Sequence, residues 1–214
     1  LESALHLANG VSSDLVIIEG SGASLIPHRN DANLLVVGIQ KGDEDLFGYT
    51  TPLRVLLADA VLVTMTGADG EGERLERFRA YVKRQKPDLD VWAARLLPRS
   101  RNPARGLRAL VVTTHRIEPE LLRQQLGLDQ VEVQAILGDR AQVVELLESR
   151  AREFDVVLTE VKSSGIDTVL HTCRRLGVSC DFLHYDLQFD DRGGGDGAAT
   201  MVRRLLDLAG VGAR

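Results

Sequence analysis

The sequence predicts an α/β protein with a mostly parallel sheet, followed by a smaller α/β domain. Short apolar runs rich in Val, Ile and Leu recur without polar alternation, which is typical of strands buried on both faces. Helical patterns lie between these runs, and such alternation indicates βαβ units whose ligands bind at the carboxyl ends of the strands. The expected strands are residues 15–18, 34–37, 60–65, 91–96, 107–112, 131–136, 156–159 and 178–183.

The first expected strand leads into a glycine turn. Residues 14–18 (DLVII) end at Glu19, and Gly20-Ser21-Gly22 follows at once. In P-loop NTPases an acidic residue at such a strand end commonly holds magnesium or its water, and glycines let the backbone approach a phosphate closely. Spacing alone favours this interpretation and its alternative equally. The alternative is a buried core strand that ends at a glycine turn, with Glu19 solvated.

A second feature lies around residues 54–66, where a short helical stretch, an Ala-Asp pair and a buried strand follow one another. Arg54 has the planar fork that suits phosphate oxygens, although an arginine at this place is more often a surface residue. Asp59 is expected to cap or support the loop. The strand after it ends at Thr64 and Thr66, and Arg95 ends the next one.

The clearest helical pattern is residues 71–84. Leu75, Phe78 and Val82 share one face, with acidic residues early and basic residues late, an order that complements the helix dipole. Residue types that begin or end helices mark three further ones. These markers are Pro119 with Gly127, Asp139 with Gln142, and Ser164 with Asp167 and Gly177.

Residues 97–106 (LPRSRNPARG) interrupt the periodicity and predict a linker. We therefore divide the chain into residues 1–98, a linker at 99–106, a small α/β domain at 107–189, and a flexible Gly/Asp-rich joint with a terminal helix at 190–214. The basic residues Arg95, Arg99, Arg101 and Arg105 would suit a polyanion, with solvated surface residues as the alternative.

Within the second domain, Lys162 follows an expected strand and precedes a helix opened by Ser163, Ser164 and Gly165. Backbone N–H groups at a helix start, together with a lysine, would make an anion site. An exposed lysine in a loop is nearly as good an interpretation.

Charge and hydropathy argue against two kinds of partner. The net charge is −5, and 26 basic residues are dispersed among 31 acidic ones, so we expect no nucleic-acid partner. No apolar run approaches the ~20 residues of a membrane helix, and residues 1–10 do not resemble a signal peptide. We expect a cytoplasmic protein with no membrane partner, and a homo-oligomer stays open.

The cysteines and histidines do not form a recognisable metal or redox motif. Cys173 and Cys180 fit neither a CxxC pair nor a zinc half-site, and we expect two buried thiols. His115, His171 and His184 have no metal-binding spacing. We therefore assign no metal to them.

The ordered motifs resemble the cyclic 2,3-diphosphoglycerate synthetase family. The likeness rests on residues 16–27 (VIIEGSGASLIP), 53–59 (LRVLLAD), 63–65 (VTM) and 160–169 (EVKSSGIDTV), and it covers most of residues 1–186. It implies a partial P-loop NTPase-type sheet and an ATP- and magnesium-dependent ligase. That enzyme closes an intramolecular phosphoanhydride on 2,3-diphosphoglycerate, and relatives would phosphorylate 2-phosphoglycerate.

Carried over by this resemblance, Glu19 would be the magnesium-linked carboxylate and Gly20, Ser21 and Gly22 the close-approach turn. Arg54 would contact a phosphate, and Lys162 would reach it from the second domain. The sequence departs from the family in having no GxxxxGK followed by Ser or Thr, the loop that holds the β- and γ-phosphates. We expect that loop upstream of Leu1, and we expect this chain to be inactive alone.

Two other interpretations remain. The missing loop favours a non-catalytic anion-binding or regulatory module that keeps the glycine turn and Lys162. Strand-Glu-Gly turns also occur in ATP-dependent ligases of the dethiobiotin synthetase type, although nothing between Glu19 and Asp59 resembles a site for a biotin precursor.

Overall fold

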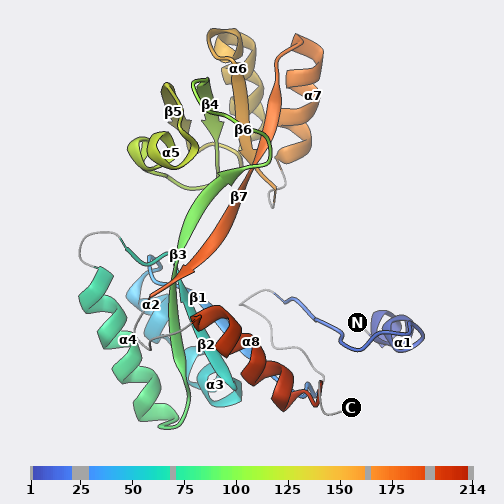
Figure 1. The fold of residues 1–214 in the computed structure, drawn as a ribbon, viewed down its shortest axis with the longest axis vertical. Helices are drawn as coiled ribbons and strands as arrows, with labels where there is room; N and C mark the ends of the chain where they lie inside the picture. The colour runs from blue at the N-terminus through green and yellow to red at the C-terminus, as the bar shows by residue number, and fades with distance from the viewer. Residues whose placement is uncertain (1, 21–28, 68–70, 162–164, 191–195, 212–214) are drawn as a thin grey trace. The chain divides into compact units, whose positions relative to one another are not determined.

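The computed structural model describes residues 2–20, 29–67, 71–161, 165–190 and 196–211 (Figure 1). Within these ranges it is an α/β structure with a mostly parallel sheet in the order β1-β2-β3-β7-β6-β4-β5, which confirms the predicted fold class. The strands are β1 (Leu34–Gly38), β2 (Ala60–Thr64), β3 (Val91–Ser100), β4 (Arg108–Val112), β5 (Gln130–Gln134), β6 (Val156–Glu160) and β7 (Cys180–Phe189).

The helices follow the expected alternation. They are α1 (Glu2–Asn9), α2 (Asp43–Phe47), α3 (Thr51–Leu57), α4 (Glu71–Gln85), α5 (Pro119–Leu126), α6 (Arg140–Arg150), α7 (Ile166–Leu176) and α8 (Gly197–Leu208), with a short 3-10 turn at Ala151–Glu153. The chain divides into two compact units: unit 1 is residues 1–95 and 188–214, and unit 2 is residues 96–187.

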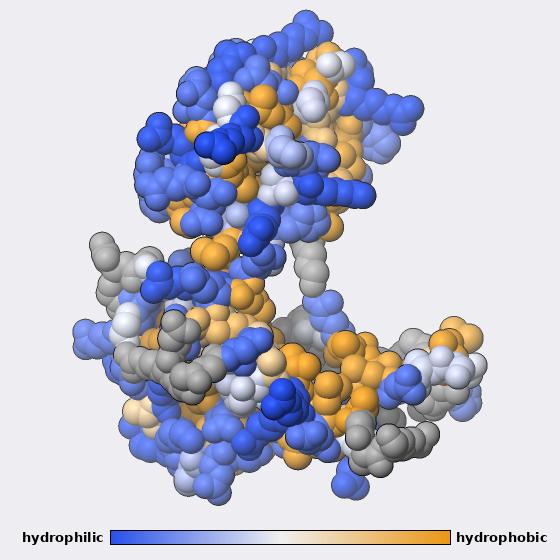
Figure 2. All heavy atoms as spheres, in the orientation of Figure 1, coloured by the Kyte–Doolittle hydropathy of each residue, from blue (hydrophilic) through white to orange (hydrophobic). Residues whose placement is uncertain are grey.

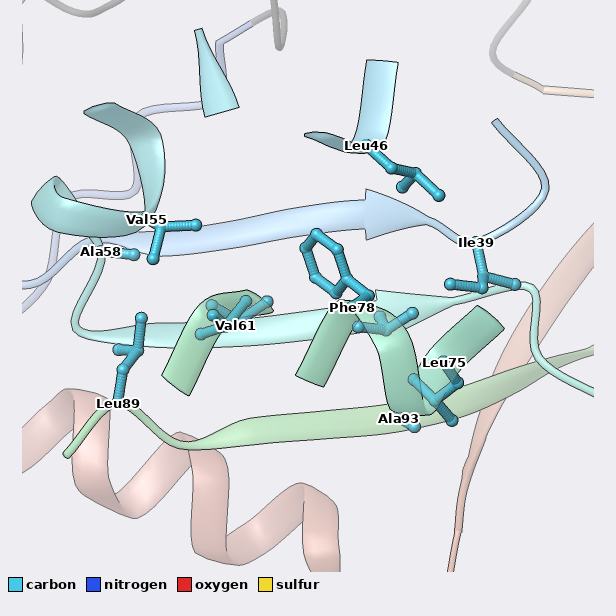
Figure 3. Close-up of a cluster of buried hydrophobic side chains, with 11 residues drawn as sticks. Ile39, Leu46, Val55, Ala58, Val61, Leu75, Phe78, Leu89 and Ala93 are labelled. Atoms are coloured by element: carbon cyan, nitrogen blue, oxygen red, sulfur yellow. The ribbon is translucent and has the colours of Figure 1, made fainter. Parts of the chain in front are cut away.

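Unit 1 contains the parallel strands β1, β2 and β3, with helices on both faces. Val61 of β2, Phe78 of α4 and Val55 of α3 are fully buried in one core between the sheet and α2, α3 and α4 (Figure 3). On the other face, Leu62 of β2 packs with Met201 of α8. Side chains alternate between the two faces because successive strand residues point to opposite sides.

In unit 2, the parallel strands follow the order β7-β6-β4-β5. Helix α5 packs on one face through Leu122, and α6 and α7 pack on the other through Leu147 and Val169 (Figure 1). Burial of this apolar surface on both faces holds the unit together.

The predicted helix ends of unit 2 are confirmed where the structure describes them. The side chain of Asp139 accepts hydrogen bonds from the backbone N–H groups of Ala141 and Gln142. Gly127 and Gly177 end α5 and α7 with φ of 66° and 68°, the left-handed region that favours glycine. The predicted Ser164 cap lies outside the described residues.

The predicted strand at residues 15–18 is wrong. These residues have no regular secondary structure, and Leu15, Val16 and Ile17 are 42%, 47% and 83% exposed. A strand forms only beside a partner that takes up its backbone hydrogen bonds, and no described strand pairs with this segment. The first described strand, β1, is instead an edge of the sheet.

Strand β3 is longer than expected, because residues 97–100 belong to it. These residues are anchored within unit 2, where Asp181 accepts hydrogen bonds from Ser100 Oγ at 3.0 Å and from the backbone N–H of Asn102 at 2.9 Å. The division of the chain at residues 99–106 stays a prediction.

Candidate functional site

The parallel strands of unit 1 end at a common edge, and the turn after β2 is its most unusual part. We call Thr64, Met65, Thr66 and Gly67 the β2 corner. Among the described residues, Met65 is the one non-glycine residue with a positive φ, which is 61°. Gly67 has a φ of 117°. A left-handed methionine stores strain, and strained backbone is concentrated at functional sites.

The β2 corner carries a buried hydroxyl that has no partner. Thr66 Oγ1 is inaccessible to solvent and makes no hydrogen bond in the described part of the chain. Burying a hydroxyl without a partner costs about 1–3 kcal/mol. A ligand oxygen at this place would supply the missing hydrogen bond.

Arg95 of β3 brings a cation to the same corner. A Cβ built on Gly67 would stand 2.9 Å from both Cδ and Nε of Arg95, so the arginine lies directly against this glycine. Arg95 is exposed, so its guanidinium can meet an anion from solvent. The corner therefore combines a cation, a hydroxyl and a closely approachable glycine.

Neighbouring side chains tie the corner to β1 and α4. Thr64 Oγ1 donates to the carbonyl of Val37 on β1 at 3.4 Å. Gln40, just after β1, donates through Nε2 to Glu71 Oε1 at the start of α4, at 3.0 Å. These bonds fix the ends of two strands and one helix around the corner.

The structure does not bring the predicted site residues together into one described site. Glu19 and Gly20 lie in the exposed segment without regular structure, so Glu19 does not occupy a strand end. Arg54 is half-buried within α3. Ser21, Gly22 and Lys162 lie outside the described residues, and the roles assigned to all six stay predictions.

Asp59 supports a loop, as expected. Its Oδ2 accepts a hydrogen bond from the backbone N–H of Asn33 at 2.9 Å, and its own N–H donates to the Asn33 carbonyl at 2.8 Å. This pair joins the starts of β1 and β2. Asp59 therefore stands at the amino edge of the sheet, opposite the β2 corner.

Four arginines were considered above as contacts for a polyanion. Two of them have structural partners in unit 2. Arg99 forms an ion pair with Asp186 of β7. Arg105 lies against Gly127, where an added Cβ would stand 3.1 Å from Arg105 Cγ. Of the four arginines considered, Arg95 is the one that the structure places at the β2 corner.

A magnesium ion would have to rely on few protein ligands here. Within the described residues no three His, Cys, Asp or Glu side chains gather to hold a metal ion. Magnesium is commonly bound through one or two carboxylates with substrate phosphates and waters. A magnesium ion at the β2 corner would therefore take most of its ligands from substrate phosphates and water.

Two features of the carboxyl edges could not be read from the sequence. The left-handed conformation of Met65 has no local signal, because methionine does not favour it. In unit 2, Glu160, Tyr185 and the adjacent pair Thr114 and His115 form a connected group from three distant parts of the chain. An acidic residue ending the apolar strand VVLTE was the available signal for that group.

Comparison with known proteins indicates the class of protein domain to which unit 1 belongs. Residues 1–94, which include the β2 corner, match the family model described as "Cyclic 2,3-diphosphoglycerate synthetase, P-loop domain". Unit 1 thus contains part of an α/β domain of the nucleotide-binding P-loop class.

Curated proteins identify the family. The chain is 30% identical to the cyclic 2,3-diphosphoglycerate synthetase of Pyrococcus abyssi over 184 residues, 86% of this chain and 42% of that protein. It is 31% identical to the protein of that name from Thermococcus onnurineus over 186 residues, 86% of this chain and 43% of that protein. The Rubrobacter xylanophilus protein of that name is 30% identical over 177 residues, 79% of this chain and 39% of its own length.

The chain belongs to the cyclic 2,3-diphosphoglycerate synthetase family. It spans less than half the length of these three relatives. None of the described helices is long and apolar enough to cross a bilayer.

Proposed function

We propose that this chain forms part of an ATP- and magnesium-dependent ligase that converts 2,3-diphosphoglycerate to its cyclic phosphoanhydride. The observation that carries the proposal is the match of residues 1–94 to the synthetase P-loop domain, over the segment that holds the β2 corner. An unpartnered Thr66 hydroxyl and an exposed Arg95 are the groups that a phosphate-rich ligand needs there.

The chemistry requires positioning more than covalent participation. Two phosphate groups of one small molecule must approach each other, so their negative charge has to be offset by cations and hydrogen-bond donors. Arg95 and Thr66 would hold phosphate oxygens at the corner. Arg54 and Lys162 remain proposed phosphate contacts. Glu19 would hold magnesium, directly or through water, and that ion would neutralise charge on the transferring phosphoryl group.

We further propose that this chain does not catalyse the reaction by itself. Its sequence contains no GxxxxGK followed by Ser or Thr, so it has no loop of the type that holds the β- and γ-phosphates of ATP. Activity would then depend on polypeptide that supplies this loop. The product and substrate are small and polar, and we propose that the protein acts in the cytoplasm.

Phosphorus NMR with ATP, magnesium and 2,3-diphosphoglycerate tests both statements. The chain as printed should give no cyclic product. The encoded polypeptide extended to include a phosphate-binding loop should give it, and Glu19→Gln in that form should slow it strongly. Glu73→Gln, on the exposed surface of α4, is the matched control and should leave the rate unchanged.

The outcomes separate the claims. Equal rates for Glu19→Gln and the unmodified form would remove Glu19 from the metal site. Cyclic product from the printed chain alone would show that no further loop is needed. Absence of product from every form would reject the substrate assignment.

The missing loop also supports a non-catalytic anion-binding module as a second candidate. Calorimetry of the printed chain with 2,3-diphosphoglycerate, without ATP, distinguishes it from the first. Saturable heat at millimolar ligand supports a module that binds anions on its own, and no heat rejects it.

A further inference from the structure

The two cysteines of the chain lie against each other in unit 2, where α7 ends and β7 begins. Cys173 belongs to α7 and Cys180 is the first residue of β7. Cys180 packs against the apolar core that contains Cys173, and one thiol is hydrogen-bonded to the other. Both thiols are free, and the chain has no other cysteine to compete for either of them. Only a small movement of the two sulfur atoms therefore separates this contact from a disulfide bond.

The backbone between the two cysteines holds them together. Gly177 ends α7 with a φ of 68°, which turns the chain sharply from the helix into the strand. The N–H of Val178 donates to the carbonyl of Cys173 at 3.0 Å, and Cys180 is fixed in the sheet by its parallel pairing with Val157 of β6. The thiol contact is thus a product of the fold. The spacing of the two cysteines in the sequence matches no CxxC motif and did not indicate it.

The two thiols differ in their access to solvent. Cys173 is 1% exposed, whereas Cys180 is only partly buried. A small reagent can therefore reach Cys180 and not Cys173 while the protein is folded. Cys173 is placed behind Cys180, where it can react only with a group that is already attached to its neighbour.

The contact also divides the acidity of the pair unequally. The hydrogen bond with Cys180 lowers the pKa of Cys173, while the same bond, burial and the nearby charge of Asp181 raise the pKa of Cys180. Once the pair has lost one proton, the negative charge is accordingly held on Cys173, and the remaining proton lies on Cys180. A thiolate is the reactive form of cysteine, so the buried sulfur is prepared for reaction.

We infer that Cys173 and Cys180 form a modification site for thiol–disulfide exchange. A small disulfide, such as oxidised glutathione, would convert the two thiols to an intramolecular disulfide that ties the end of α7 to the start of β7. This site lies within unit 2, uses none of the residues assigned to ATP, magnesium or substrate, and does not depend on the proposed function.

The exchange takes place in two steps. Cys180 passes its proton to the Cys173 thiolate as its sulfur attacks the small disulfide, whose S–S bond breaks; a new S–S bond forms to Cys180, and the first small thiolate leaves and takes a proton from water. Cys173 then loses its proton to solvent and attacks the sulfur of Cys180, which releases the second small thiol. Two protein thiols are oxidised, and one small disulfide is reduced to two thiols.

Mass spectrometry of the full chain tests the product. The folded protein is incubated with oxidised glutathione, the remaining thiols are blocked with N-ethylmaleimide in urea, and the protein is digested without reduction. Trypsin cleaves after Arg174 and Arg175, so the two cysteines fall in separate peptides. We expect these peptides to be joined by a disulfide in monomeric protein. Two free thiols, a product that stops at a glutathione adduct, or a bond between two chains would overturn the proposal.

Two variants test the order of the steps, with circular dichroism to confirm that each is folded. Cys173→Ser keeps the accessible thiol and removes the one that completes the exchange, so glutathione should remain attached to Cys180. Cys180→Ser keeps only the buried thiol and should stay unmodified until urea is added. Modification of the folded Cys180→Ser protein as fast as the parent, or no adduct on Cys173→Ser, would contradict the proposed order.

Hydrogen exchange tests whether the disulfide ties the two elements together. The Val178 amide lies inside the loop that the disulfide closes, and its exchange should be roughly 10–100-fold slower in the oxidised protein, because the bond restricts opening of that loop. Dithiothreitol should restore the original rate. The Val61 amide, which donates to the Asp90 carbonyl in unit 1, is the control and should exchange equally in both forms. Equal Val178 rates in the oxidised and reduced proteins would refute the tie between α7 and β7.

Discussion

The side chain of Arg95 lies against Gly67, so closely that a Cβ on the glycine would stand 2.9 Å from Arg95 Cδ and Nε. The same glycine has a φ of 117°, a conformation that L side chains rarely adopt. Two independent reasons, space and backbone geometry, therefore require glycine at this position. The guanidinium of Arg95 keeps its place at the β2 corner because no side chain occupies that space.

Replacing Gly67 with Ala should displace Arg95 and destabilise the protein by about 1–3 kcal/mol, the range for a residue forced into a sparsely populated backbone conformation. Urea unfolding measures the loss. Gly72→Ala is the control, because a Cβ at Gly72 in α4 meets nothing within 4 Å. That control should be neutral or stabilising by up to about 1 kcal/mol, and equal losses in both variants would contradict the role of the Arg95 contact.

Replacing Thr66 with Val should raise stability and lower function. The hydroxyl of Thr66 is buried without a partner, so an isosteric methyl group removes a desolvation cost of about 1 kcal/mol. In the loop-containing polypeptide, the same change should weaken nucleotide or substrate binding, measured by calorimetry. Lower stability with unchanged binding would show that the hydroxyl has no ligand role.

Asp181 should make unit 2 sensitive to acid. Burial tends to raise the pKa of this carboxyl, but hydrogen bonds from the N–H groups of Asn102 and Phe182 and from the Ser100 side chain lower it on balance. A lowered folded-state pKa means that the stabilisation is present near neutrality and is lost as pH falls through the folded pKa.

Asp181→Asn should consequently cost about 1–3 kcal/mol at pH 7, the range for impairing hydrogen bonds to a buried charged group. The free energies of unfolding of the two proteins should converge as the pH falls below roughly 4, where the unfolded carboxyl is protonated. Urea unfolding across this pH range measures both. A constant difference at all pH values would contradict the ionised role of Asp181.

Among the described residues β1 is an edge strand of the sheet, and we expect this edge to promote self-association of the chain. Val36 is 55% exposed on this edge strand, and apolar surface also gathers around α8, where Val202 and Leu208 are exposed (Figure 2). A lysine on an edge strand opposes pairing with another strand. Val36→Lys should therefore lower the concentration-dependent association measured by sedimentation.

Tyr49→Lys is the matched control for this edge effect. Tyr49 is 99% exposed but lies outside the strands, so its replacement removes apolar surface without altering the β1 edge. Equal reductions by both variants would indicate general hydrophobic contact instead of edge pairing.

Most elements could be predicted because their signals are local. The apolar runs at β1, β2 and β6 and the face formed by Leu75, Phe78 and Val82 all appear in the structure as expected. The strand expected at residues 15–18 has the same local signal but no described strand beside it, and pairing is a property of two segments. Local pattern alone could not show that difference.

The candidate sites depend on contacts between residues that are far apart in the chain. The sequence alone reveals few of these contacts. Glu160 meets Thr114 across 46 positions and Tyr185 across 25, so neither pairing leaves a motif. Thr66 and Arg95 could be placed at strand ends, but the orphaned hydroxyl and the contact with Gly67 follow from three-dimensional packing. The sequence was more informative on family than on geometry.

The two cysteines stand together at the join of α7 and β7, where a hydrogen bond from one thiol to the other lowers the pKa of Cys173 and raises that of Cys180. Both are free, and the chain has no other cysteine. Cys173 is buried but Cys180 is only partly buried, so the expectation of two buried thiols holds for Cys173 alone. A thiol-reactive dye would therefore reach Cys173 only when the join of α7 and β7 opens. Labelling rates would record the opening of unit 2 selectively, with unit 1 silent, and so give a native reporter of its dynamics without any engineered probe.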